Sequence, residues 1–427
     1  MKKEDTHIHH NRLSLQSALA HTIHTINISH KKVFLRLDLN VSLDPDTAMI
    51  LSDYKLHAIR PTLDLLHNTK ATIIIATHWG KPTHHDLRFS TRHLIPWFTQ
   101  HNYTVTHIDT LEAAEKIINI THEYNTTADK PVIILLENMR FYEGENPDAP
   151  EIVKYTFAQQ LKQLSDYYIN DAFGALHRSD TSMTILPTLF TTDNRSIGLL
   201  IHKELHALMP LITQTEHPFV MISGGKKINT KLPMLIKMLD VLDIILLCPA
   251  LVFTLLKAQG YSIGESFYEP TYTQKSLELI TQAQEKNVVV VLPSDFQMRH
   301  TNTTPNFTQK LISVNAHDIP ANGVGISIGP KTVEQFIHHI QHAKIVVYNG
   351  PMGFIDQPDT LNSTQKILQA MIDSRANGTR IIGGGDTIAC AQQFNMLNGF
   401  DHISTGGGSM MALLSDSPLP ALDILAS

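Results

Sequence analysis

Residues 380–387 of the chain read R-I-I-G-G-G-D-T. Ile381 and Ile382 have the β-branched, apolar character of the end of a buried strand. The three glycines that follow let the backbone turn sharply and approach a ligand closely, because no Cβ stands in the way. Asp386 can bind a metal ion or cap the next helix, which Thr387 opens, and a helix N-terminus after a strand is a ready anion site. A plain strand-to-helix turn without a ligand is the alternative for this stretch taken alone.

The composition of the 427-residue chain is that of a globular protein, with 42% hydrophobic and 17% charged residues. The length exceeds one ordinary core, so we expect two domains. A formal net charge of −6 argues against a general nucleic-acid binder. The apolar runs are too short to span a membrane, and the start lacks the apolar core of a secretory signal. The two cysteines, Cys248 and Cys390, form no C-x-x-C pair, so we expect a reducing, cytoplasmic setting.

In the first half of the chain, apolar strands alternate with helices, and each strand ends in a polar loop. Residues 33–41 alternate so that Arg36, Asp38 and Asn40 project from one side of a strand. We interpret this polar side as the wall of a cleft; a buried polar network is the alternative. The order of elements predicts a parallel sheet with right-handed crossovers. The other elements expected here are strands at 72–76, 104–108, 131–136 and 167–170, and helices at 55–66 and about 91–100.

Cationic and titratable side chains follow the ends of these strands. Parallel sheets bind ligands outside the carboxyl ends of their strands. Arginine suits phosphate and carboxylate because its planar fork donates two parallel hydrogen bonds. We therefore predict that these groups converge on one anion. They are His78, Lys81, Arg140, His177 and Arg178.

The second half repeats the alternation and carries glycines at its strand ends. A helix expected at residues 197–211 joins the two halves. Gly224 and Gly225 precede Lys227 and Lys231, which lie one helical turn apart, as in a phosphate-binding loop. The chain contains no Walker A motif. The remaining elements expected here are strands at 219–222, 241–247, 288–292 and 345–348, a loop at 325–331, and the strand that ends at the three glycines of residues 383–385.

The chemistry that these loops favour is phosphoryl transfer. Four glycine-bearing loops indicate a nucleotide, and the basic cluster of the first half indicates an anionic partner. No paired carboxylates and no Ser/His/Asp set stand out for covalent catalysis. Phosphoryl transfer depends on positioning and charge neutralisation more than on a nucleophilic side chain.

Ten motifs in order give the chain a resemblance to a known family. They include R-L-D-L-N-V from residue 36, L-L-E-N-M-R-F-Y-x-G-E from residue 135, N-D-A-F-G-x-x-H-R from residue 170, S-G-G-K-K-I-N-T-K from residue 223, N-G-P-M-G from residue 349 and the opening stretch. From about residue 31 to residue 414 the chain resembles phosphoglycerate kinase.

The resemblance implies an α/β fold with two similar doubly wound parallel-sheet, Rossmann-like domains that face each other across a cleft and are joined by a helix. The implied parts are an N-terminal phosphoglycerate-binding domain at 1–196, an interdomain helix at 197–212, a C-terminal nucleotide-binding domain at 213–405 and a segment at 406–427 that returns to the first domain. The implied reaction is transfer of a phosphoryl group between 1,3-bisphosphoglycerate and ADP, giving 3-phosphoglycerate and MgATP in glycolysis or gluconeogenesis. We expect a monomer without nucleic-acid or membrane partners.

The resemblance also implies site residues. Those of the phosphoglycerate side are Asp38, Asn40, Lys55, His78, Lys81, Arg140 and Arg178. Those of the nucleotide side are Gly224, Gly225, Lys231, Asn349, Gly350, Asp356, Gly384, Gly385, Asp386 and Thr387. Catalytic roles are implied for Lys55, Lys227, Lys231, Gly384 and Gly407, and Asp386 would hold Mg²⁺ near the phosphates.

Several positions depart from the family pattern. Lys55 and Lys81 stand where the family has arginine, and lysine keeps the charge but loses the bidentate fork. Asp180 stands where the family has a histidine, which removes one cation from the basic cluster. The other departures are Cys248-Pro249-Ala250 for three glycines, Ser327 for aspartate and Asp356 for glutamate. They motivate an alternative function, a non-catalytic or weakly active nucleotide-binding descendant with a regulatory role.

Overall fold

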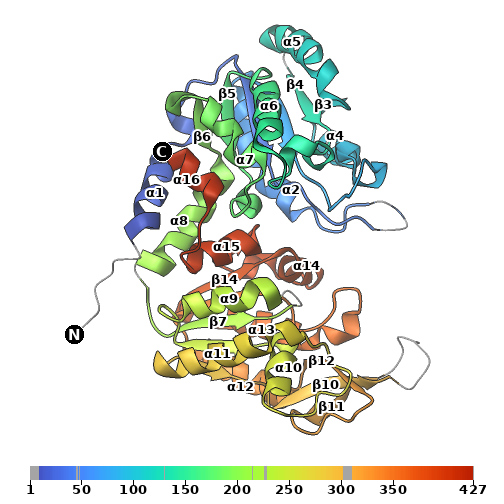
Figure 1. Ribbon diagram of the computed structural model, residues 1–427, viewed down its shortest axis with the longest axis vertical. Helices are drawn as coiled ribbons and strands as arrows, with labels where there is room; N and C mark the ends of the chain where they lie inside the picture. Colours follow the sequence, from blue (N-terminus) through green and yellow to red (C-terminus); the bar gives the residue numbers. More distant parts are fainter. Residues whose placement is uncertain are drawn as a thin grey trace. The chain divides into compact units, whose positions relative to one another are not determined.

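The computed structural model describes residues 9–44, 47, 49–128, 130–213, 215–225, 228–301 and 310–426, with the side chains of residues 9–14 left out. The chain divides into two compact units, Met1–Ala207 with Pro418–Ser427, and Leu208–Ser417. Each unit contains a six-stranded parallel sheet with helices packed against it (Figure 1). The predicted fold class, an α/β protein with two parallel-sheet domains, is confirmed.

The sheet of the first unit has the strand order β3-β4-β2-β1-β5-β6. The central strands are almost entirely buried and mostly apolar, as expected for a sheet covered on both faces. Because β1 lies between β2 and β5, the strand order reverses beside it, and such a switch point opens a crevice at the carboxyl ends. The strands are β1 Lys32–Leu37, β2 Thr72–Thr77, β3 Thr104–Ile108, β4 Val132–Leu136, β5 Tyr167–Asn170 and β6 Arg195–Ile197.

The helices of the first unit include both ends of the described chain. Helices α1 and α16 lie side by side (Figure 1), and Ser17 Oγ donates a hydrogen bond of 2.6 Å to the carbonyl of Ala426. The helices are α1 His9–Ala20, α2 Tyr54–Ala58, α3 Arg60–Asn68, α4 Ile95–Gln100, α5 Leu111–Thr127, α6 Glu151–Lys162, α7 Thr181–Thr184 and α16 Pro420–Ala426, together with α8 Leu199–Thr213, within which the two units divide.

The sheet of the second unit has the order β15-β14-β13-β7-β8-β9, and a three-stranded antiparallel sheet, β11-β10-β12, accompanies it. The strands are β7 Phe219–Ser223, β8 Ile244–Leu247, β9 Val289–Val291, β10 Asp295–His300, β11 Ile312–Asn315, β12 Gly323–Ile328, β13 Ile345–Asn349, β14 Thr379–Gly383 and β15 His402–Ser404. The helices are α9 Ile228–Met238, α10 Pro249–Ala258, α11 Thr273–Glu285, α12 Pro330–His342, α13 Asn362–Asp373, α14 Gly385–Gln393 and α15 Gly407–Leu414.

Several local predictions differ from the structure. The single helix expected at 55–66 is divided into α2 and α3, because Pro61 begins a new helix in its first turn. The expected loop at 325–331 contains the end of β12 and the start of α12. The antiparallel sheet was not predicted, since its short strands carry few consecutive apolar residues.

The interpretation of Arg36 as part of a cleft wall is wrong. Its side chain is fully buried, and its Nη2 lies 3.6 Å from Glu145 Oε1 and 4.0 Å from Asp180 Oδ2. Its Nε donates to Ser182 Oγ at 2.7 Å. The alternative, a buried polar network, is what the structure contains, because a buried guanidinium has to be paired.

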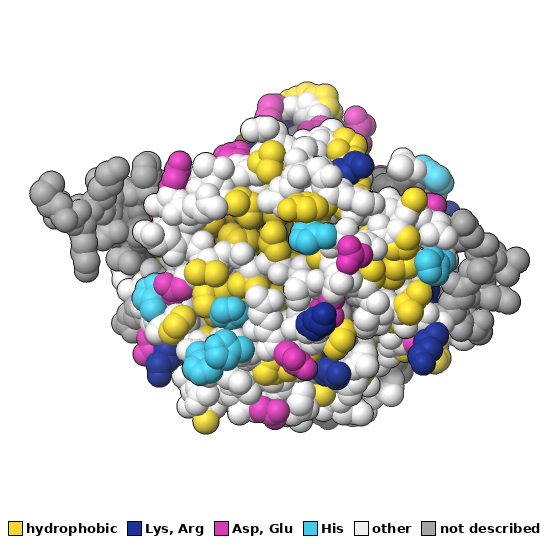
Figure 2. Space-filling model, turned by 90° about the horizontal axis from the view of Figure 1, so that it is seen from below, with side chains coloured by type: hydrophobic (Ala, Val, Ile, Leu, Met, Phe, Trp, Pro, Cys, Tyr) yellow, Lys and Arg dark blue, Asp and Glu magenta, His cyan; other side chains and the backbone are white. Residues whose placement is uncertain are grey.

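The described surface is mixed in charge. On the face that Figure 2 shows, lysine, arginine and acidic side chains are interspersed among apolar and polar ones. None of the described helices combines the length and the apolar character that crossing a membrane requires.

Candidate active site

Polar side chains from four loops meet at the carboxyl edge of the first sheet. Asp38 and Asn40 follow β1, and His78 follows β2. Arg140 follows β4, and Arg178 lies beyond β5. The short helix α2 adds Lys55 to this group. The structure therefore brings together six of the seven residues predicted for the phosphoglycerate side.

Asp38 is the centre of this group. Its Oδ2 accepts a hydrogen bond from Lys55 Nζ at 2.7 Å, and its Oδ1 lies 3.9 Å from His78 Nε2. Its Oδ1 also accepts from the backbone N–H of Asn40 at 3.2 Å. Burial alone would raise the pKa of Asp38, but the charge and hydrogen bond of Lys55 and the hydrogen bond from the Asn40 backbone hold the pKa well below its usual range. Asp38 is therefore ionised and fixes the Lys55 ammonium.

His78 is neutral at physiological pH. Burial lowers its pKa to about 3, and the positive charges of Arg36, Arg140 and Arg178 act in the same direction, whereas Asp38 opposes them. A neutral imidazole can donate or accept a hydrogen bond but adds no charge. The cationic charge of the cluster is therefore carried by its arginines and by Lys55.

Asn138 holds the loops of this cluster in place, and the sequence reasoning did not single it out. Its side-chain amide donates to the carbonyl of Trp79 at 2.8 Å and accepts from the Trp79 N–H at 3.0 Å. Its Oδ1 also accepts from the N–H of Arg140 at 3.1 Å, while the Arg140 guanidinium donates to the carbonyl of Gly80. The Gly80 N–H in turn donates to Asn40 Oδ1 at 2.8 Å. No pattern in the sequence identifies Asn138, because its contacts form only when the sheet brings the loops after β2 and β4 together.

Asp180 neutralises part of the cluster. It accepts two hydrogen bonds from Arg178, at 2.8 and 3.0 Å, in a bidentate pair. Burial would raise the pKa of Asp180, but the hydrogen bonds and charge of Arg178 lower it. Arg178 is thus held by an internal carboxylate.

Lys81, by contrast, is exposed, and no hydrogen bond among the described residues joins its side chain to the cluster.

The second sheet gathers glycines and helix N-termini at its carboxyl edge. The neighbouring strands β7, β13, β14 and β15 end there, and α9, α14 and α15 begin there. A Cβ on Gly224 would lie 2.3 Å from the carbonyl oxygen of Gly350, and one on Gly407 would lie 2.7 Å from the Cα of Gly384. The loop after β7 therefore contacts the loop after β13 at a glycine, and the start of α15 contacts the loop after β14 in the same way. Backbone N–H groups and helix dipoles at such an edge favour an anionic group.

Lys231 lies buried within this edge. Its Nζ donates to Asn349 Oδ1 and to the Asn349 carbonyl, both at 2.7 Å, and also to the carbonyl of Gly224. The N–H of Gly350 donates to Thr387 Oγ1 at 2.8 Å, which ties β13 to α14. The ammonium thus lies at the point where the loops after β7 and β13 meet.

Gly384, Gly385 and Asp386 lie where β14 ends and α14 begins. Gly384 has a φ of 88°, and Gly385 begins α14 with no atom within 4 Å of where its Cβ would be. Asp386 is exposed in the first turn of α14, and Asp356 is exposed after β13. An exposed carboxylate beside a phosphate-binding edge fits Mg²⁺, which binds one or two carboxylates and keeps several waters. Lys227 lies outside the described residues.

The two edges suit different anions. The first offers arginine and lysine side chains, whereas the second offers backbone N–H groups, the buried ammonium of Lys231 and the exposed carboxylate of Asp386. Each arrangement can bind and orient a phosphorylated ligand and neutralise its charge.

Comparisons with known proteins agree on one family. The family model described as phosphoglycerate kinase matches residues 23–417. The cytosolic phosphoglycerate kinase 3 of Arabidopsis thaliana is 31% identical, over 94% of this chain and 96% of its own. The phosphoglycerate kinase of Bdellovibrio bacteriovorus is 33% identical, over 95% and 96%. Among solved structures, phosphoglycerate kinase from Coxiella burnetii matches with a TM-score of 0.73 and 28% identity, and that from Pyrococcus horikoshii with 0.78 and 25%; each match covers 95% of this chain and 98% of the other.

Proposed function

Because the chain belongs to the phosphoglycerate kinase family, we propose that it transfers a phosphoryl group reversibly between 1,3-bisphosphoglycerate and ADP, giving 3-phosphoglycerate and ATP. The observation that carries the proposal is the position of Lys231, buried where glycine-lined loops meet at the edge of the second sheet. A polyphosphate chain can reach such a site only where side chains are absent.

The basic cluster of the first unit is the proposed site for the phosphoglycerate. Arg140, Arg178 and Lys55 would pair with the phosphate and carboxylate groups of this ligand. Asp38 orients Lys55, and Asn40 holds the loop that carries His78 by accepting from the Gly80 N–H. Lys81 is exposed and would join the ligand only as a mobile point charge.

The glycine edge of the second unit is the proposed nucleotide site. Backbone N–H groups of Gly384, Gly385 and Gly407 would receive the phosphates, together with Lys227 and Lys231. Gly224, Gly225, Asn349, Gly350 and Thr387 would shape the loops around them. Asp356 would bind the ribose, because carboxylates accept hydrogen bonds from hydroxyl groups. Asp386 would hold Mg²⁺, which neutralises phosphate charge when it is bound.

The reaction balances without a covalent enzyme intermediate. An oxygen of the β-phosphate of ADP forms a bond to the phosphorus of the acyl phosphate, while the bond from that phosphorus to the carboxyl oxygen breaks. The carboxylate of 3-phosphoglycerate leaves with the electron pair. Lys55 and Lys231 would neutralise the charge on the transferring group, because each ammonium group lies at an edge proposed to bind one of the two ligands. We further propose that the enzyme acts as a cytoplasmic monomer.

A test compares two lysines of helix α9. Lys231→Met removes the buried ammonium, whereas Lys237→Met removes an exposed one that donates to Ser417 Oγ at 3.0 Å. Loss of one preorganised donor costs about 10²–10³ in rate, so Lys231→Met should lower kcat of ATP formation by that factor while Lys237→Met stays near wild type. Circular dichroism and thermal unfolding verify that both variants fold. Equal activity of a folded Lys231→Met variant and wild type would remove the observation on which the proposal rests.

A further inference from the structure

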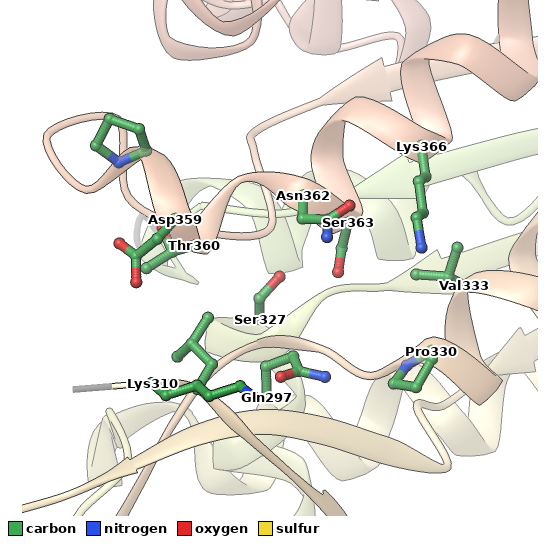
Figure 3. Close-up of a pocket in the computed structure, with 12 residues that line it drawn as sticks. Gln297, Lys310, Ser327, Pro330, Val333, Asp359, Thr360, Asn362, Ser363 and Lys366 are labelled. Carbon is green, nitrogen blue, oxygen red and sulfur yellow. The ribbon is translucent and has the colours of Figure 1, made fainter. Parts of the chain in front are cut away.

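A cavity of about 640 Å³ lies in the second unit (Figure 3). It is lined by the antiparallel sheet, the start of α12 and the start of α13, and it opens to solvent. Its volume falls within the range typical of small-molecule sites. None of its lining residues belongs to the proposed nucleotide set. The residues that the argument uses are Gln297, Lys310, Ser327, Asp359, Asn362 and Lys366.

Ser327 supplies an unsatisfied hydrogen-bonding group to this cavity. Its side chain is 1% exposed, and its Oγ has no hydrogen-bond partner among the described residues. In Figure 3 the hydroxyl points into the cavity, toward the side on which Asn362 and Ser363 lie. Ser363 is already used, because its Oγ donates to the carbonyl of Ile328 at 2.8 Å. A buried hydroxyl without a partner is unfavourable, and a ligand oxygen in the cavity would satisfy it.

The charge in the cavity is positive. Lys310 and Lys366 both line it, and neither takes part in an ion pair within the described part of the chain. Asp359 also lines the cavity, but its carboxylate is paired with Arg299, whose Nη1 donates to Gln357 Oε1 at 2.6 Å. Two ammonium groups therefore remain without a counter-ion, which favours an anionic ligand.

The cavity lies on one face of the antiparallel sheet only. Gln297 is opposite Ser327 in the ladder between β10 and β12, and both side chains line the cavity. Phe296, the next residue along, alternates to the other face, where its ring packs 4.8 Å from that of Phe253 on α10. The sheet thus separates the cavity from the helix that follows β8.

We propose that this cavity is a second anion site, which binds a small phosphate or polycarboxylate compound independently of the nucleotide. The ligand would accept hydrogen bonds from Ser327, Gln297 and Asn362 and lie between the ammonium groups of Lys310 and Lys366. Amide and hydroxyl groups give such a site direction, and the two lysines give it charge. The inference does not depend on the reaction proposed above.

The test uses equilibrium dialysis of the full chain with labelled inorganic phosphate and, in a separate series, labelled citrate, each with and without saturating ADP. Lys310→Ala/Lys366→Ala should weaken binding of the preferred probe about tenfold, and Ser327→Ala about threefold. The matched control, Lys331→Ala/Lys344→Ala, makes the same change in net charge outside the cavity and should bind as wild type does. Thermal unfolding establishes that each variant folds.

Three results would overturn the proposal. The first is equal loss of binding in the two double variants, which would indicate a general effect of charge. The second is loss, in the presence of saturating ADP, of the difference in binding between wild type and Lys310→Ala/Lys366→Ala, which would make the cavity part of the nucleotide site. The third is the absence of any binding difference between wild type and Lys310→Ala/Lys366→Ala with both probes. Preference for phosphate over citrate, or the reverse, assigns the ligand class.

Discussion

Lys55 Nζ lies 2.7 Å from Asp38 Oδ2 at the carboxyl edge of the first sheet. The resemblance to the family implies arginine at the position of Lys55, so one ammonium here would replace a planar fork. Asp38 is ionised and fixes the direction of the ammonium, which compensates in part for the lost second donor. The Lys55 side chain remains 21% exposed, so a ligand can still reach it.

Lys55→Ala should therefore abolish most turnover, and Lys55→Arg should keep or raise it. A charged hydrogen bond contributes about 1.5–3 kcal/mol, which predicts a fall of about ten- to 150-fold in kcat/KM for 3-phosphoglycerate in Lys55→Ala. Steady-state kinetics of both variants measure this, with Lys116→Ala on α5 as the control for an exposed lysine of the same unit. Wild-type kinetics in Lys55→Ala would mean that another group supplies the charge.

Asp180→Asn should strengthen substrate binding. The substitution releases Arg178 from its bidentate pair and leaves Arg36 close to Glu145. We expect KM for 3-phosphoglycerate to fall about threefold, because the guanidinium no longer has to exchange one carboxylate for another. Asp193→Asn, at an exposed position of the same unit, should leave KM unchanged. A rise in KM with Asp180→Asn would instead assign Asp180 the task of orienting Arg178.

Two glycines of the nucleotide edge should respond differently to alanine. Gly350 has a φ of 96°, and a Cβ there would lie 2.2 Å from the Gly224 carbonyl oxygen, so Gly350→Ala should lower the free energy of unfolding by about 2 kcal/mol or more. At Gly385 the structure has room for a methyl group. Gly385→Ala should therefore retain stability but weaken ADP binding about tenfold, since the methyl group would stand where a phosphate approaches the backbone.

Urea unfolding and calorimetric ADP titration measure the two quantities separately. A Gly385→Ala variant with unchanged ADP affinity would exclude close approach of the phosphates to this residue. A Gly350→Ala variant as stable as wild type would contradict the contact between the loops after β7 and β13.

Stability should depend on pH through His78. In the unfolded chain an imidazole takes up a proton below about pH 6.5, whereas folded His78 stays neutral until about pH 3. The unfolded state therefore binds more protons in this interval, and stability falls as the pH drops through it. Between pH 6.5 and pH 5, wild type should lose about 2 kcal/mol more than His78→Gln does.

Urea unfolding at both pH values measures this loss, with His84→Gln as the exposed control. Burial raises the pKa of Glu145 to about 7, and this group acts in the opposite direction, but its contribution cancels in the difference between wild type and His78→Gln. An equal loss in the two proteins would place His78 in contact with solvent.

The sequence predicts the two parallel sheets because their strands are short apolar runs that end in polar or glycine-rich loops. It also predicts that Asp38, His78, Arg140 and Arg178 share one edge, since the carboxyl ends of parallel strands do so. It does not reveal which of the polar residues that follow the strand alternation of residues 33–41 is fully buried. Arg36 and Asp38 have the same strand parity, yet only the pairing of Arg36 with Glu145, more than 100 positions away in the chain, explains its burial.

The sequence alone also does not predict that Asp180 is the counter-ion of Arg178, or that Asn138 holds the loops of the cluster together. The sequence shows that an acidic residue stands at position 180, but not that its carboxylate pairs with the Arg178 guanidinium. Side chains two residues apart in a loop have no fixed distance or direction from each other. Asn138 bridges two loops whose approach is set by the sheet. Such contacts depend on tertiary structure and leave no periodic pattern in the sequence.

The most direct test of the central claim is a transfer assay with the purified wild-type chain. Incubation with γ-labelled ATP, Mg²⁺ and 3-phosphoglycerate should move the label into an acyl phosphate, with one ADP formed for each label transferred. Hydroxylamine should then convert the acyl group into a hydroxamate and release the label as inorganic phosphate. Omission of 3-phosphoglycerate or of Mg²⁺ should stop the transfer. Absence of label transfer above the background without enzyme, in a folded protein that binds ADP, would contradict the assignment of this chain as an active phosphoglycerate kinase.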